Sequence, residues 1–209
     1  MENDFLLPYK IKTIKQEKKL KPVYTEEELK VLLRKPNFED GFAEWRGWLV
    51  INLLMGTGVR AGTAVRIKMT DVDLRANRIY TRHNKNGEIY SLIMGKRLKK
   101  AIMSFLTQAA VEGAEYLITS VSGEQMTTSG LYQAIEKYNI GRGVTKKSLH
   151  LFRHTFSSMW AKNGGDAITL QNILGHSDIR TTIGYINLYA PASEYSRLVK
   201  LNPLEKFGK

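Results

Sequence analysis

The longest apolar run in the chain, WLVINLLMG at residues 48–56, is the feature that most constrains its fold. A helix that crosses a bilayer needs about 20 apolar residues, so this run is too short to span a membrane. It predicts instead an apolar helix over residues 43–55, which the Gly-Thr-Gly that follows ends just before Arg60. In a chain of 209 residues that is 43% hydrophobic, we expect one sizeable core and one compact domain.

Helical patterns account for most of the remaining chain. The sequence TEEELKVLL begins a helix with Thr25 as its N-cap and Glu28 three residues further on, which together form a capping box. Gly164 and Gly175 are placed to end two later helices. The apolar spacing predicts further helices at about residues 60–67, 96–111, 128–139, 149–163, 166–174 and 179–189.

Residues 78–94 have the pattern of a β-hairpin. RIYTRH and EIYSLIM are rich in β-branched and aromatic residues, and the NKNG between them supplies an Asn-Gly turn. Lys85 lies near the tip of this hairpin. The expected fold is therefore of the α+β class: mainly α-helical, with a small antiparallel sheet that includes the hairpin.

The charge of the chain bears on its partners. Lys and Arg total 32 against 20 for Asp and Glu, a net charge of +12, which indicates nucleic acid or an anionic membrane as partner. Residues 8–22 hold six of the lysines and are typical of an extended segment, either a solvated tail or a linker that contacts phosphates. The first residues lack the regions of a signal peptide, so we expect an intracellular protein.

The stretch HLFRHT raises the question of a metal site. His150 and His154 are four residues apart, the spacing with which helical histidine pairs bind zinc. Leu151 follows His150 where such a site has a Glu, and Arg153 would set a fixed positive charge beside the metal. The chain also has no cysteine, which excludes thiolate ligands and nucleophiles. We therefore expect no metal, and a nucleophile that is oxygen or nitrogen.

An anion suits this helix better than a cation. Arg153 offers a fixed charge with a fork of donors, and a histidine beside it can donate or transfer a proton. Such groups stabilise a phosphodiester, whose non-bridging oxygens gain charge in the transition state. Burial would strengthen the contacts, and the phosphate would supply the missing counter-charge. The motif alone leaves open that the helix is only salt-bridged within the fold.

Three stretches in a fixed order indicate a family. They are LLMGTGVRAGTAVRIKMTDVDL, HLFRHTF and LGHSDIRTTIGY, and in the last of them Tyr185 follows His176 by nine residues. Together they resemble the tyrosine recombinase (phage integrase) family over about residues 22–200. The family pattern is an Arg, a hairpin Lys, His-x-x-Arg, a Leu-Gly-His box and a nucleophilic Tyr, and several boxes in order are a strong signal.

The resemblance implies catalytic roles for six residues. Arg60 and Arg153 would clamp the non-bridging oxygens of a DNA phosphate, and Tyr185 would attack its phosphorus to form a 3′-phosphotyrosyl bond. Lys85 would protonate the leaving 5′-oxygen. The histidines of the two boxes would assist by hydrogen bonding to the phosphate or by moving the tyrosine proton; they are His150 and His176. Because the arginines neutralise the developing charge, no metal is required. Because the protein linkage stores the energy of the phosphodiester, no ATP is required, and we expect no small-molecule cofactor.

One predicted role has a rival residue, and some positions depart from the family pattern. Tyr189, one helical turn beyond Tyr185, is the nearest rival for the nucleophile. We interpret His154 as mostly structural, because the helix turns it away from the direction of Arg153. Thr63 stands where the family commonly has an acid, and either of two nearby acids could substitute for it: Asp71 or Asp73.

The resemblance also sets expectations for domains and partners. Residues 1–22 would be a basic linker or tail, and residues 23–209 a catalytic domain without the N-terminal DNA-gripping domain that family members usually carry. The C-terminal stretch at residues 193–207 would be a helix that docks on a neighbouring subunit or on its own domain. We expect double-stranded DNA as partner, assembly to a tetramer on DNA, no membrane association, and a cytoplasmic, nucleoid-associated protein encoded by a bacterial mobile element.

Three functions compete at this level. The first is site-specific recombination by a mobile-element integrase, which predicts covalent capture of DNA by Tyr185. The second is DNA relaxation of the type IB topoisomerase kind, which uses similar chemistry but no partner strand. The third is a DNA-binding accessory protein that catalyses nothing. The Leu-Gly-His box and His150 favour the first.

Overall fold

The computed structural model describes residues 22–81, 90–176 and 178–189. The described part is mainly helical, with one small antiparallel sheet, and this confirms the expected fold class. The helices are α1 (Glu26–Leu32), α2 (Phe42–Thr57), α3 (Ala61–Ala64), α4 (Lys96–Gln108), α5 (Thr128–Gly141), α6 (Leu149–Lys162), α7 (Ala167–Leu174) and α8 (Ile179–Tyr189). A short 3₁₀ helix, η1 (Met69–Asp71), precedes the strands β1 (Val72–Asp73), β2 (Arg78–Thr81) and β3 (Tyr90–Ile93).

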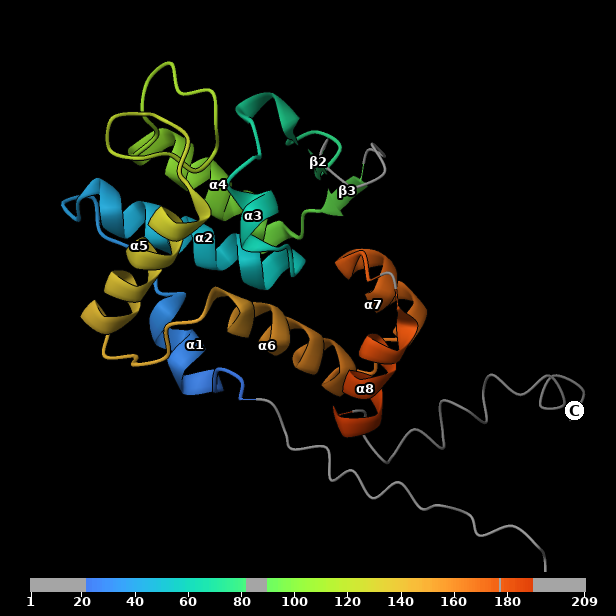
Figure 1. Ribbon diagram of the computed structural model, residues 1–209. Helices are drawn as coiled ribbons and strands as arrows, with labels where there is room; N and C mark the ends of the chain where they lie inside the picture. Colours follow the sequence, from blue (N-terminus) through green and yellow to red (C-terminus); the bar gives the residue numbers. More distant parts are fainter. Residues whose placement is uncertain (1–21, 82–89, 177, 190–209) are drawn as a thin grey trace, which may run out of the picture.

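Helix α2 forms the centre of the core. It is apolar on all sides, so it is stable only when other elements cover it. It packs against α3, α4, α5 and α6, and Figure 1 shows it running through the middle of the molecule. Leu49, Ile51 and Leu53 are completely buried, as is Phe152 on α6. The expected helix at residues 43–55 is confirmed, and it ends at Gly58 in the left-handed conformation.

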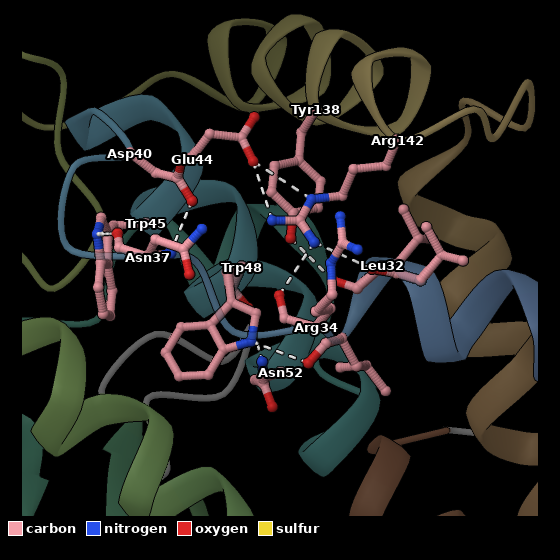
Figure 2. A network of polar contacts seen from close by, with 12 residues as sticks. Leu32, Arg34, Asn37, Asp40, Glu44, Trp45, Trp48, Asn52, Tyr138 and Arg142 are labelled. Atoms are coloured by element: carbon pink, nitrogen blue, oxygen red, sulfur yellow. Dashed lines mark hydrogen bonds and ion pairs between the residues drawn. The ribbon is translucent and has the colours of Figure 1, made fainter.

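Helix α1 depends on neighbouring side chains for its C-terminal carbonyl groups, which have no partners within the helix. Figure 2 shows these side chains gathered around the end of α1. The Tyr138 hydroxyl donates to Leu32 O (2.8 Å), and the Trp48 indole N–H donates to Leu33 O (3.1 Å). Arg142 donates to two more carbonyl oxygens at 3.0 Å and pairs with a carboxylate of α2; these partners are Val31, Arg34 and Glu44. At its other end α1 has the predicted capping box of Thr25 and Glu28.

The sheet has the strand order β1-β2-β3, and both pairings are antiparallel. Ile79 on β2 pairs with Leu92 on β3, and both are buried in the core. The strands of the expected hairpin are thus confirmed, while its turn and Lys85 lie outside the described residues. Strand β1 was not predicted, because two residues are too few to show an alternating pattern. In Figure 1 the sheet lies on the same side of the molecule as α7 and α8.

Two predicted helices are shorter in the structure. The helix expected at residues 60–67 is reduced to α3, because the chain then turns to pair with a distant segment: Leu117 N–H donates to Ile67 O at 2.9 Å. Helix α4 ends at Gln108 and not at residue 111. The other helix bounds agree with expectation within two residues, and Gly175 caps α7 as predicted. Gly164 has positive φ one residue beyond the C-cap of α6.

Gly47 permits the close crossing of α2 and α5, and this gives a first prediction. A Cβ atom at Gly47 would lie 2.6 Å from Cγ of Tyr138, which is closer than packed carbon atoms approach. Gly47→Ala should therefore lower the free energy of unfolding by about 1–3 kcal/mol, as overpacking of a core does. Gly141→Ala on α5 is the matched control, since nothing lies within 4 Å of its added Cβ. Urea denaturation measures both, and equal stabilities would contradict the described crossing.

Candidate active site

Helix α6 holds Arg153 in the interior of the protein, where only 4% of its surface is exposed. Its Nη1 donates to Gly58 O at 2.8 Å, and its Nη2 donates to Leu174 O at 2.7 Å. Gly58 caps the C-terminus of α2, and Leu174 is the last residue of α7. The carbonyl groups at helix C-termini lack partners within the helix and carry the negative end of the helix dipole. Two helix ends therefore hold this buried cation in a fixed orientation.

Arg60 lies beside Arg153 but is exposed. Its guanidinium donates to Leu174 O and to Gly175 O, both at 3.4 Å, so the two arginines share one carbonyl group. Arg60 is the N-cap of α3, directly after the turn that follows α2. In the part of the chain that the structure describes, neither arginine forms an ion pair with a carboxylate. The two guanidinium groups thus form a concentrated positive charge at the end of α7.

This concentration of positive charge affects the pKa of the buried arginine. Burial, and then repulsion by Arg60, lowers the pKa of Arg153 to about 10. The group remains cationic at neutral pH, but its charged form is destabilised relative to water. An anion placed between the guanidinium groups would offset that cost, and the low local dielectric would strengthen its contacts with them. The site is therefore suited to a phosphate.

Tyr185 is the aromatic residue that α8 brings to this site. Its side chain is 7% exposed, and its hydroxyl forms a hydrogen bond with Nδ1 of His154 on α6. Burial raises the pKa of the Tyr185 phenol, and the charge of Arg153 acts in the opposite direction. The phenol is therefore neutral at physiological pH. It can act as a nucleophile only if a base takes its proton and cations stabilise the oxygen.

The two predicted histidines occupy different positions around this group. His176 follows the end of α7, and its Nδ1 lies 2.9 Å from the Thr182 hydroxyl on α8. Its backbone carbonyl also accepts from Gln171 Nε2 at 3.0 Å, so it is fixed at the junction of α7 and α8. His150 is exposed at the start of α6, and its ring meets that of His154 edge-on, with centroids 4.4 Å apart.

The structure brings together most of the residues that the sequence singled out. Arg60 and Arg153 both donate to Leu174 O. Burial raises the pKa of the nearby Tyr185 phenol, and the charge of Arg153 lowers it. His150 lies on α6 and His176 directly follows α7, and these are the two helices that pack against α8. Tyr189, the rival nucleophile, lies against Lys162, whose Nζ is 5.8 Å from the centre of its ring.

His154 makes a contact with the candidate nucleophile that the sequence interpretation does not predict. It was interpreted as mostly structural, but it contacts the hydroxyl of Tyr185 directly. The four-residue spacing from His150 placed both rings on one face of the helix, and this was the available signal. The spacing could not show that α8 lies against this face of α6, because that depends on tertiary packing.

Tyr90, at the start of β3, is a further residue near the site that the sequence does not indicate. Burial raises the pKa of its phenol, and the charge of Arg153 acts in the opposite direction.

The acids considered as substitutes for the one missing at Thr63 have other partners. Asp71 is buried and accepts from the backbone N–H of Lys68 at 3.0 Å. Asp73 accepts from the N–H groups of Arg75 and Ala76, which closes the turn between β1 and β2. Both carboxylates thus serve local turns. The groups that orient the arginines are instead the carbonyl oxygens at the ends of α2 and α7.

In the part of the chain that the structure describes, no helix is long and apolar enough to cross a membrane. Among the same residues, no three His, Cys, Asp or Glu side chains are grouped so as to hold a metal ion.

Comparisons with known proteins identify the family. The model of the phage integrase family matches residues 22–191. The chain therefore belongs to the phage integrase family, and the resemblance inferred from its motifs is confirmed.

Named relatives agree with this assignment. The chain is 31% identical over 140 residues to tyrosine recombinase XerA of Saccharolobus solfataricus, an alignment that covers 67% of this chain and 45% of the relative. It is 29% identical over 192 residues to XerC of a bovine strain of Staphylococcus aureus, covering 90% of this chain and 63% of the relative. The chain thus spans less than two thirds of the length of these curated relatives.

Solved structures show the same fold. A crystal structure of XerA recombinase superposes with a TM-score of 0.69 at 28% identity, covering 90% of this chain and 65% of the other. The integrase of transposon Tn1549, in complex with transposon right end DNA, superposes with a TM-score of 0.66 at 21% identity, covering 91% of this chain and 68% of the other. At that lower identity the likeness concerns the fold alone.

The different settings of the two arginines give a second prediction. Arg153→Ala leaves two carbonyl acceptors without their buried donor, so it should lower the free energy of unfolding by about 2–5 kcal/mol. Arg60→Ala should cost less than about 1 kcal/mol, because its bonds are long and its side chain is exposed. Urea denaturation of both variants measures the difference. Equal losses would contradict the structural role given to Arg153.

Proposed function

We propose that this chain is the DNA-cleaving and rejoining domain of a site-specific recombinase, with Tyr185 as its nucleophile. The observation that carries the proposal is the meeting of two guanidinium groups at the C-terminal end of α7, with the buried Tyr185 phenol near Arg153 and no ion pair to either arginine within the described residues. Arginine forks match the oxygens of a phosphodiester, and a phenol beside them can attack its phosphorus. The family assignment and the net charge of +12 support double-stranded DNA as the substrate.

Arg153 is suited to bind a phosphate without leaving its place in the fold. A guanidinium has five N–H donors, and the bonds to Gly58 O and Leu174 O occupy two of them. Three donors remain for a phosphate, and the two bonds to the carbonyl oxygens fix the orientation of these donors. Arg60 can exchange its long bonds at Leu174 and Gly175 for shorter, charge-assisted bonds to the same phosphate. Donors fixed in this way stabilise the charge that develops in the transition state.

The proposed reaction has two reversible steps. The Tyr185 oxygen forms a bond to phosphorus while the bond to the 5′-oxygen breaks, which gives a 3′-phosphotyrosyl linkage. Lys85, as proposed from the family pattern, protonates the leaving 5′-oxygen, and His150 and His176 assist at the phosphate. A 5′-hydroxyl of another strand then attacks the linkage and releases Tyr185. Because the linkage conserves the energy of the phosphodiester, the residues present need neither ATP nor a metal ion for this sequence of steps.

The wider setting is also a proposal. Recombination exchanges strands between two DNA duplexes, which requires several active sites at once, and assembly into a tetramer on DNA would supply them. We place the protein in the bacterial cytoplasm at the nucleoid, as the product of a mobile element. The match to the phage integrase family supports that setting.

The nucleophile gives a third prediction. The native chain, incubated with a pool of nicked DNA duplexes of randomised sequence, should form a covalent adduct that survives denaturing electrophoresis. Tyr185→Phe should abolish the adduct, because it removes the attacking oxygen. Tyr189→Phe is the matched control on the same helix and should retain it, since the Tyr189 ring lies against Lys162.

Other outcomes of this experiment would overturn the proposal. A shift in mobility under native conditions with no covalent adduct would indicate a DNA-binding protein without catalysis. An adduct combined with relaxation of supercoiled plasmid, but no exchange between duplexes, would indicate a topoisomerase. An adduct that persists in Tyr185→Phe and disappears in Tyr189→Phe would move the nucleophile one helical turn.

A further inference from the structure

We propose that His154 is a further catalytic residue, the base that takes the proton of Tyr185 during cleavage. This inference rests on the proposed function. It assigns the proton transfer to a histidine outside the six residues that the family pattern supplies. The observation behind it is the hydrogen bond between Nδ1 of His154 and the Tyr185 hydroxyl, which joins α6 to α8.

The geometry favours His154 over the other two histidines for this role. A base must lie within hydrogen-bonding reach of the proton that it removes, and His154 already does so. Nδ1 of His176 is instead 2.9 Å from the Thr182 hydroxyl. His150 packs its ring edge-on against that of His154, so it is placed to orient that ring. We therefore assign His150 a positioning role toward His154, in addition to any contact with the phosphate.

The surroundings explain why a base is needed at this position. Burial raises the pKa of the Tyr185 phenol, so the fraction that is ionised at neutral pH is smaller than for a tyrosine in water. Arg153 stabilises the phenolate but does not remove the proton. Besides the pair itself, the titratable and charged groups on the two helices that carry it are His150, Arg153 and Lys162 on α6 and Arg180 and Tyr189 on α8. Tyr90 on β3 and, beside the end of α7, Arg60 and His176 are the further described groups near Arg153 and α8.

The proton transfer balances with the rest of the reaction. His154 must carry its hydrogen on Nε2, so that Nδ1 is free to accept. The O–H bond of Tyr185 breaks as its proton passes to Nδ1, the phenolic oxygen bonds to phosphorus, and the bond to the 5′-oxygen breaks. The leaving oxygen takes its proton from the general acid. In the rejoining step the Tyr185 oxygen leaves phosphorus and recovers the proton that His154 holds.

The test separates the base from the acid by the choice of DNA. The probe is a pool of duplexes of randomised sequence in which sulfur replaces the bridging 5′-oxygens, since a thiolate leaves without protonation. With the full chain, His154→Gln keeps a polar side chain of similar reach but cannot accept a proton, so it should slow adduct formation by about 10²- to 10⁴-fold. His154→Ala should be slowed as much, and added imidazole should restore it. Tyr189→Phe should react at the native rate.

The pH dependence distinguishes a base from a merely structural residue. Adduct formation by the native chain should slow on the acidic side, where a protonated imidazole can no longer accept a proton. His154→Gln should lose that dependence while its thermal unfolding stays close to that of the native chain. A His154→Gln variant with the native rate and the native pH profile would overturn the inference. No adduct from the native chain itself would overturn the proposed function, so the two failures are distinguishable.

Discussion

The site depends on one buried interaction, the hydrogen bonds from Arg153 to the carbonyl oxygens of Gly58 and Leu174. A buried cation normally requires a carboxylate partner, because removing it from water is costly. Here the C-terminal ends of α2 and α7 supply the compensation, since their carbonyl groups lack helical partners and carry the negative end of the helix dipole. The bonds that keep the guanidinium buried also fix its orientation. No carboxylate among the described residues pairs with this charge, and this leaves it available for an anion.

This interaction restricts the residues around it. Gly58 has φ +64, and a Cβ atom there would lie 2.6 Å from the Phe156 ring and 2.7 Å from the Leu174 side chain. Gly175 has φ +59 and ends α7, so its carbonyl can reach Arg60. The glycines that end α2 and α7 are therefore part of the site, although they carry no reactive group. The arginines, in turn, hold the end of α7, which packs against α8, and α8 places Tyr185 near Arg153.

The sequence predicted what is encoded locally. The capping box at Thr25, the apolar helix α2 and the paired strands β2 and β3 depend on neighbours in the chain, and all are found. The length of α3 depends on a distant segment at Leu117, which no local pattern reveals. The same limit applies to the site. The partners of Arg153 are backbone carbonyl groups, which every residue has, and the contact of His154 with Tyr185 exists only because α8 packs on α6. The family pattern named the arginines and the tyrosine, but it could not show which histidine contacts the hydroxyl.

The central claim is that this constellation of fixed charge allows a phenol to break a DNA strand. The most direct measurement is mass spectrometry of the covalent protein–DNA product after digestion with protease and nuclease. The account predicts one modified peptide, with a 3′-linked nucleotide on the oxygen of Tyr185. A nucleotide carried by any other side chain, or a linkage to the 5′ end of the broken strand, would contradict it.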